Sequence, residues 1–149
     1  MDHVCRHISV EVWGEETEEL PGASPALSRF QGAAWGLEMY RILQSSQIIL
    51  NHHIDMAESY ANNMRLFEAT GVGTLLITDW KENLSEIFEP GKEVVAYRSA
   101  EECVELLRYY LENEEERETI ASAGQRRTLG EHSYYQRMKE LVEIVHKYA

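Results

Sequence analysis

The chain has little cysteine and contains no long hydrophobic run. Its two cysteines, Cys5 and Cys103, lie far apart and form no C-x-x-C pair. This spacing argues against a disulfide framework or a cysteine zinc site, and it favours buried thiols. No window approaches the roughly 18 apolar residues of a membrane-spanning helix, and the first residues lack the apolar stretch of a secretory signal. We therefore expect a cytoplasmic protein without membrane insertion.

Basic residues are also scarce, at 14 against 26 acidic residues, which gives a formal net charge of -12. Such a field repels phosphate backbones and anionic lipids, so nucleic acid is not an expected partner. A small anionic ligand is still compatible with it, because a few backbone N–H groups and one arginine can hold a phosphate locally. The hydrophobic content of 44% excludes a disordered chain, and 149 residues suffice for one domain.

Short apolar runs alternate with helical patterns, which is typical of a parallel sheet covered by helices on both faces. The pattern predicts strands at residues 8–13, 29–34, 47–51, 74–78 and 93–97. It predicts crossover helices at residues 37–46, 63–70 and 83–88. The expected fold class is therefore α/β, with a Rossmann-like, mostly parallel sheet flanked by helices.

The last third of the chain is predicted to be a helical tail. Ser99 and Glu102 form a capping box at the start of one helix. A second helix is expected at residues 114–129, with Gly130 as its stop. A third carries an apolar face made of Met138, Leu141, Val142, Val145 and Tyr148.

The segment from Tyr60 to Glu68 is the best candidate for a ligand site. A helix starting near Asn63 would place its free N–H groups at the carboxyl end of the preceding strand, where open α/β sheets bind ligands and anions. Arg65 would lie in the first turn, and the Glu68 carboxylate could accept two hydroxyl hydrogen bonds from a sugar ring. The alternative is structural: Asn62 or Asn63 caps the helix, and Glu68 pairs with a surface cation.

The ordered run NxRxFEATGxGxLLxTDW, followed by LxExFEPGKEVVxYRSxEEC, resembles the C-terminal half of GT-B glycosyltransferases. The resemblance is specifically to the CgeB-like group of the glycosyltransferase group 1 families. It extends over nearly the whole chain from about Ile8, including the segments FQGAAWGLEMYRIL, IILN and EEERETIASAGQRRTLGEHSY. It implies that residues 1–149 are a single nucleotide-sugar-binding domain, half of a GT-B fold and a fragment of a longer two-domain protein.

The resemblance also implies roles for individual residues. Glu68 corresponds to the second glutamate of the family's E-x7-E element, which holds the ribose hydroxyls. The backbone around Asn63 would meet the diphosphate, residues 32–34 would lie near the base, and Arg65 is expected to contact the diphosphate or the sugar. The complete predicted donor-binding set is Glu68, Arg65, Asn63, Asn62, Met64, Tyr60, Gly32, Ala33 and Ala34.

The sequence departs from the family pattern at the first glutamate of that element. Tyr60 stands eight residues before Glu68, and Glu58 lies two places out of register. The expected function is donor binding in an enzyme that transfers a sugar from a nucleoside-diphosphate sugar to an acceptor. The N-terminal acceptor domain of the parent protein would be the partner, so the chain alone is expected to be inactive. The alternative is a non-catalytic glycosyltransferase-like binding module in spore or cell-envelope assembly.

No catalytic residue, resident cofactor or metal is assigned from the sequence. His52, His53 and Asp55 resemble a metal cluster, but adjacent histidines on a strand would point to opposite faces. One of the two histidines is expected to line the donor cleft. Trp35 is a candidate for stacking on the base, and Asp79 either touches the sugar or caps the next helix.

Overall fold

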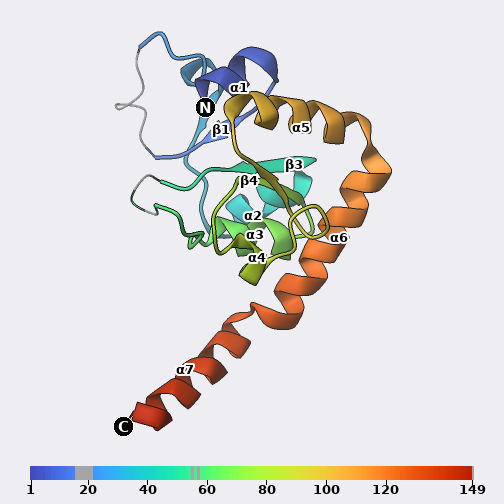
Figure 1. The fold of residues 1–149 in the computed structure, drawn as a ribbon. Helices are drawn as coiled ribbons and strands as arrows, with labels where there is room; N and C mark the ends of the chain where they lie inside the picture. Colours follow the sequence, from blue (N-terminus) through green and yellow to red (C-terminus); the bar gives the residue numbers. More distant parts are fainter. Residues whose placement is uncertain (16–21, 55, 57, 149) are drawn as a thin grey trace.

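Two parallel sheets organise the computed structural model, which describes residues 1–15, 22–54, 56 and 58–148 (Figure 1). In the first sheet β1 (Val12–Trp13) pairs with β2 (Phe30–Gly32). The second sheet has the order β3 (Ile48–Asn51), β4 (Leu75–Asp79) and β5 (Val95–Tyr97). Helices flank the sheets, so the predicted α/β class with parallel strands is confirmed.

The three-stranded sheet is built around β4, in which every residue is buried. Its register pairs Ile48 with Leu75 and Asn51 with Thr78, while Asp79 pairs with Tyr97 on the other side. Because all three strands run in the same direction, their carboxyl ends meet at one edge. We call this the carboxyl edge, and the opposite one the amino edge.

Helices cover both faces of this sheet. On one face, α1 (Asp2–His7), α5 (Ala100–Glu112) and α6 (Glu114–Glu131) pack against alternate residues of β4 and β5. On the other face, α3 (Arg65–Gly71) and α4 (Leu84–Ile87) pack around Leu76 and Phe88. The helix α2 (Gly36–Ser45) and a short 3₁₀ turn, Leu27–Arg29, complete the first half.

The contact between α3 and α6 is close and partly polar. The Thr70 hydroxyl donates to the Leu66 carbonyl at 2.7 Å and lies 2.6 Å from the Thr128 hydroxyl. Gly124 faces the Glu93 carbonyl so closely that an added Cβ would lie 2.3 Å from its oxygen. The absence of a side chain at Gly124 therefore allows α6 to approach the chain that enters β5.

Three expectations about the elements were wrong in detail. The first strand comprises Val12–Trp13 instead of residues 8–13, and the helix α1 (Asp2–His7) precedes it. The helix α3 begins at Arg65, two residues later than expected. Gly130 does not stop α6, which continues to Glu131 and closes with a hydrogen bond from the His132 N–H to the Thr128 carbonyl.

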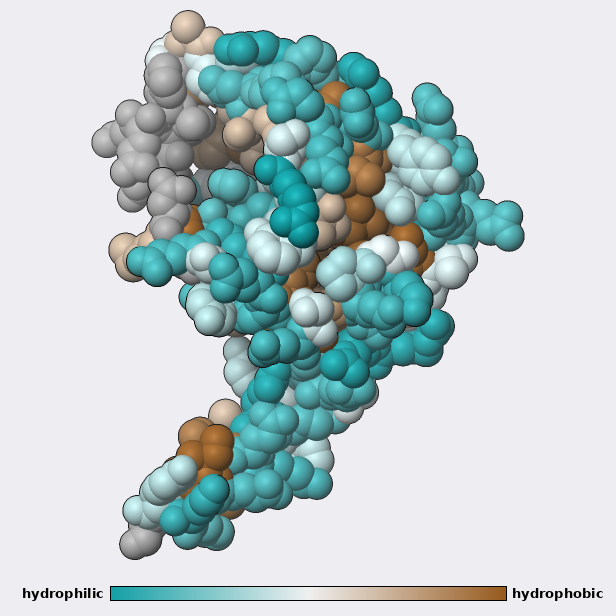
Figure 2. All heavy atoms as spheres, viewed as in Figure 1, coloured by the Kyte–Doolittle hydropathy of each residue, from teal (hydrophilic) through white to brown (hydrophobic). Residues whose placement is uncertain are grey.

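The last helix, α7 (Tyr134–Tyr148), extends away from the body of the domain (Figure 1). None of its described residues is buried, and all except the half-buried Gln136 are exposed, including the predicted apolar face. Brown, hydrophobic atoms gather on this helix in Figure 2. Within the described ranges, no helix is long and apolar enough to cross a membrane.

Candidate functional site

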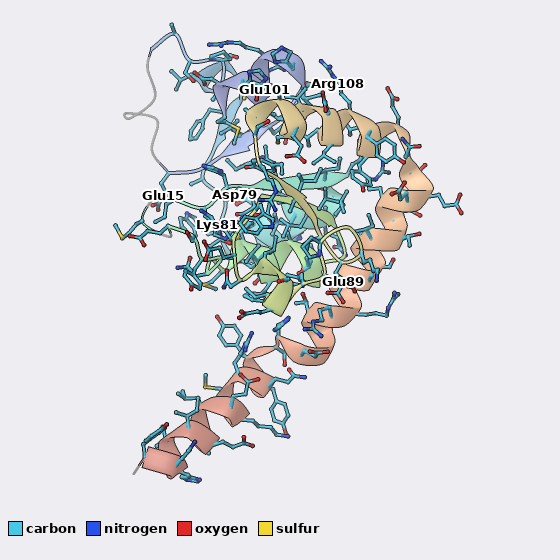
Figure 3. The ribbon with its side chains drawn as sticks, viewed as in Figure 1. Glu15, Asp79, Lys81, Glu89, Glu101 and Arg108 are labelled. Carbon is cyan, nitrogen blue, oxygen red and sulfur yellow. The ribbon has the colours of Figure 1, made fainter. Side chains whose placement is uncertain are left out.

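A buried carboxylate, Asp79, organises the carboxyl edge of the sheet. Its Oδ1 accepts hydrogen bonds from the His53 backbone N–H at 3.0 Å and from His53 Nδ1 at 2.7 Å. Its Oδ2 lies 3.3 Å from Lys81 Nζ, and Figure 3 shows both labelled side chains at this edge. Burial opposes ionisation of Asp79, but the hydrogen bonds from His53 outweigh it and lower its pKa.

A chain of hydrogen bonds leads from Asp79 to the segment that precedes α3. The Thr78 hydroxyl donates to Asp79, and Asn51 Nδ2 donates to the Thr78 hydroxyl at 2.9 Å. Asn63 Nδ2 then donates to Asn51 Oδ1, also at 2.9 Å. Buried and half-buried side chains from two strands and from the segment between β3 and α3 thus form one polar network at the carboxyl edge.

His52 belongs to a neighbouring pair on the same edge. The Tyr97 hydroxyl donates to the Asn51 carbonyl at 3.1 Å and lies 3.1 Å from His52 Nδ1. Because Tyr97 has a single hydroxyl proton, His52 Nδ1 is the donor in the second contact. Burial is the largest cause that raises the pKa of Tyr97, and the negative charge of Asp79 adds to it, so the Tyr97 hydroxyl stays protonated at neutral pH.

A hollow of about 510 Å³ opens beside this pair and is lined by Leu50, His52, Asp79, Trp80, Arg98 and Cys103, among others. The Arg98 guanidinium lies over the Trp80 ring, 4.0 Å from its centroid. Burial raises the pKa of the Cys103 thiol to about 11, so it is protonated at neutral pH and is no nucleophile. Both cysteines are buried and free, as expected.

The predicted pair Arg65 and Glu68 lies on the first turn of α3 and forms an ion pair. Arg65 Nη1 is 3.2 Å from Glu68 Oε2, and the Glu68 side chain is 15% exposed. Glu68 therefore does pair with a cation, as the structural alternative expected. The other half of that alternative was wrong: α3 has no side-chain cap, and the Asn63 side chain bonds Asn51 instead.

The remaining predicted residues lie in two separate segments of the chain. Asn62, Tyr60 and Met64 are exposed in the segment before α3. Gly32, with a φ of 96°, ends β2 and leads through Ala33 and Ala34 to the start of α2. None of the nine predicted residues lines the hollow beside His52 or a second, smaller one at the amino edge.

Trp35 is the N-cap residue of α2 and is 64% exposed. Its indole is therefore accessible next to residues 32–34, where the base is expected. Whether it stacks on a base stays a prediction.

The two histidines do not point to opposite faces. The strand β3 ends at Asn51, so the alternation of a strand no longer applies at His52 and His53. Both Nδ1 atoms approach the Asp79 carboxylate, His53 at 2.7 Å and His52 at 3.7 Å. Asp55 lies outside the described residues, and among those that are described no group of three metal-ligating side chains comes together.

The sequence pattern did not predict the contacts of Asp79 and Lys81 that hold the site together. Asp79 does not cap the next helix, because α4 has Asn83 at its N-cap position, and it holds His53 instead. Its contact with a sugar stays a prediction. Lys81 was not singled out, although it donates to the Glu58 carbonyl at 2.6 Å and contacts Asp79. The available signal was the position of Asp79 at the carboxyl end of a buried strand, β4.

A family model described as glycosyl transferase-like matches residues 2–143. The chain belongs to this glycosyl transferase-like family. The narrower likeness to the CgeB-like group stays a prediction. No curated protein matches the chain significantly.

Solved structures share the fold of this glycosyl transferase-like chain at low identity. A glycosyltransferase from Rickettsia africae has a TM-score of 0.74 at 14% identity, covering 96% of this chain and 41% of that protein. Anabaena HepE in complex with UDP-glucose has a TM-score of 0.71 at 12% identity, covering 83% and 34% respectively. Sucrose-phosphate synthase from Thermosynechococcus elongatus has a TM-score of 0.71 at 12% identity, covering 99% and 42%.

The chain thus spans 34% to 42% of the length of these three proteins. At such identities the likeness establishes the fold, which is that of one half of a GT-B glycosyltransferase.

Proposed function

We propose that residues 1–149 form the donor-binding domain of a glycosyltransferase, which acts within a longer two-domain protein. The observation that carries the proposal is the gathering of polar side chains at the carboxyl edge of a parallel sheet, where open α/β folds bind ligands. Membership of the glycosyl transferase-like family supports it, as does the UDP-glucose complex of the structurally similar HepE. The cytoplasmic location stays a prediction.

The donor we propose is a nucleoside-diphosphate sugar. In this scheme the Glu68 carboxylate accepts hydrogen bonds from the ribose hydroxyls, and Arg65, which pairs with it at 3.2 Å, turns to the diphosphate. The backbone around Asn62, Asn63 and Met64 meets the diphosphate, and Tyr60 lies beside it. The backbone of Gly32, Ala33 and Ala34 lies near the base. The net charge of -12 makes local neutralisation by Arg65 important, because the overall field repels the ligand.

In the parent enzyme the acceptor would enter from a second, N-terminal domain. Sugar transfer would break the bond between the anomeric carbon and the diphosphate oxygen. The acceptor nucleophile would bond to that carbon and release its proton to a base or to solvent. The positive charge of Arg65 would stabilise the departing diphosphate. We propose that the chain alone binds the donor without turning it over.

The alternative proposal, a non-catalytic binding module in spore or cell-envelope assembly, is favoured by Tyr60. It replaces the family glutamate and is 58% exposed. A protein of this kind could retain nucleotide binding without transfer, so activity of the full-length parent protein distinguishes the two proposals.

Replacing Glu68 by glutamine is expected to weaken the binding of the preferred nucleoside diphosphate about tenfold, because a charge-assisted hydrogen bond to ribose is lost. The measurement is calorimetric titration with UDP, GDP and ADP, followed by the 2′-deoxy form of the tightest ligand. The wild-type chain should bind the 2′-deoxy ligand more weakly than the ribose form. In Glu68→Gln the two forms should bind equally well.

The matched control is Glu105→Gln, which removes an exposed carboxylate from α5. It should leave the titration unchanged. Absence of saturable binding for all three diphosphates would contradict the donor-binding proposal, and an unchanged deoxy effect in Glu68→Gln would contradict the role of Glu68.

A further inference from the structure

Two buried polar atoms at the carboxyl edge have no assigned purpose. His53 Nε2 and Asn63 Oδ1 are both buried and have no hydrogen-bond partner among the residues that the structure describes. The His53 side chain is completely buried. Buried polar atoms are nearly always paired, so each unpaired one calls for an explanation. These two lie at opposite ends of a single hydrogen-bonded network.

The ionised carboxylate of Asp79 fixes the direction of that network. A carboxylate only accepts hydrogen bonds, so the Thr78 hydroxyl must donate to it. The Thr78 oxygen then accepts from the Asn51 amide, which leaves the Asn51 oxygen to accept from the Asn63 amide. The Asn63 Oδ1 atom is consequently left outside the network as an acceptor.

The same reasoning applies at the other end. His53 Nδ1 donates its proton to Asp79 over 2.7 Å, so a neutral imidazole has an unprotonated Nε2. Lys81 Nζ, at 3.3 Å from the second carboxylate oxygen, already supplies a positive charge to Asp79. With its proton on the Asp79 side, the neutral form of the imidazole also leaves Nε2 as an acceptor.

We propose that His53 Nε2 and Asn63 Oδ1 accept hydrogen bonds from hydroxyl groups of the donor sugar. Two acceptors suit hydroxyl donors and disfavour phosphate oxygens, which carry only lone pairs. The pair thus distinguishes a nucleoside-diphosphate sugar from the free diphosphate. This inference rests on the proposed function and deepens it, because it assigns recognition of the sugar to residues outside the family's E-x7-E element.

Asp79 has a positioning role in this scheme. It touches no hydroxyl itself, but it sets the tautomer of His53 and, through Thr78 and Asn51, the orientation of the Asn63 amide. Both acceptor atoms are buried in the ligand-free chain, so a sugar hydroxyl reaches them only if donor binding exposes them.

The experiment compares UDP, GDP and ADP, each with its glucose conjugate, by calorimetry on the full chain. The measured quantity is the affinity ratio of the conjugate to the diphosphate. The variant His53→Asn places an amide nitrogen where Nδ1 was, so it preserves the contact with Asp79 and removes only Nε2. We expect the ratio to fall about tenfold in His53→Asn and in Asn63→Ala. The control Ser122→Ala, at the amino edge, should keep the ratio.

Nitrogen NMR of the wild-type imidazole provides a readout that does not require a variant to fold. We expect His53 to carry its proton on Nδ1 alone, and its Nε2 resonance to move with the glucose conjugate and not with the diphosphate. A proton on Nε2 would overturn the proposal. The proposal would also be overturned if the diphosphate binds and the affinity ratio of conjugate to diphosphate is the same in the wild type and in His53→Asn. A buried water would then be the partner of Nε2. Absence of any diphosphate binding would instead overturn the proposed function.

Discussion

Replacing Gly124 with alanine is expected to lower the free energy of unfolding by roughly 2–3 kcal/mol, the range of an overpacked core. The new Cβ would lie 2.3 Å from the Glu93 carbonyl oxygen and 3.4 Å from Thr70 Cγ2. Neither a backbone carbonyl nor a hydrogen-bonded threonine moves away easily. The helix α6 must therefore shift from both the entry to β5 and α3.

The matched control is Gly130→Ala in the same helix, because no atom lies within 4 Å of the Cβ that it adds. It should stabilise the protein by about 0.5–1 kcal/mol, the difference in helix propensity between alanine and glycine. Urea denaturation followed by circular dichroism measures both variants. Equal effects at the two positions would show that α6 is not closely packed at Gly124.

Replacing Asp79 with alanine is expected to cost about 3 kcal/mol, because it leaves a buried imidazole and a nearly buried ammonium without their shared partner. His53 is 2% exposed, and the Lys81 side chain is 13% exposed. The variant Asp79→Asn should cost less, since an amide oxygen can still accept the two hydrogen bonds from His53. Denaturant unfolding at neutral pH checks this order.

The pH dependence of stability gives a second check on Asp79. Its pKa in the folded protein is lowered from the ordinary value of 3.8, so the unfolded chain takes up the proton first as the pH falls. The stabilisation is therefore complete above the unfolded pKa and is lost as pH falls through the folded pKa. Between pH 5 and about pH 3 the unfolding free energy of the wild type should fall more steeply than that of Asp79→Asn. Parallel curves would contradict the lowered pKa of Asp79 in the folded protein.

The buried strands could be predicted from the sequence because short continuous apolar runs are typical of strands buried on both faces. Residues 74–78 anticipated β4 with a shift of one position, since a fully buried parallel strand is a continuous apolar run. The first strand was overestimated because Ile8 and Val10 are apolar for another reason. They pack against the core without pairing in a sheet.

The ends of helices were harder to predict from sequence. Gly130 was expected to stop α6, yet glycine also occurs inside helices at modest cost, and the helix continues to Glu131. The short helix α1 lacks a long periodic pattern, and its contacts with α5 are tertiary. Packing, which the local sequence does not contain, determines both outcomes.

The candidate site also has one part that the sequence predicts and one part that it does not. Arg65 and Glu68 are three positions apart, so their spacing alone predicted that both side chains lie on one turn of a helix. The contact between His53 and Asp79 joins residues 26 positions apart, and only the parallel pairing of β3 and β4 brings them together. Motif spacing therefore identified the edge of the sheet, but not the carboxylate that organises it.

The most direct test of the account is to locate the bound ligand by NMR, adding the tightest of UDP, GDP and ADP to the isotope-labelled chain. We expect amide shift changes in residues 60–68, at the carboxyl edge, and in residues 32–36, with little change around Gln47, Thr74 and Ser122 at the amino edge. Shift changes centred on the amino edge would contradict the claim that the carboxyl edge holds a nucleoside-diphosphate sugar. The absence of any shift change at millimolar ligand would contradict it as well.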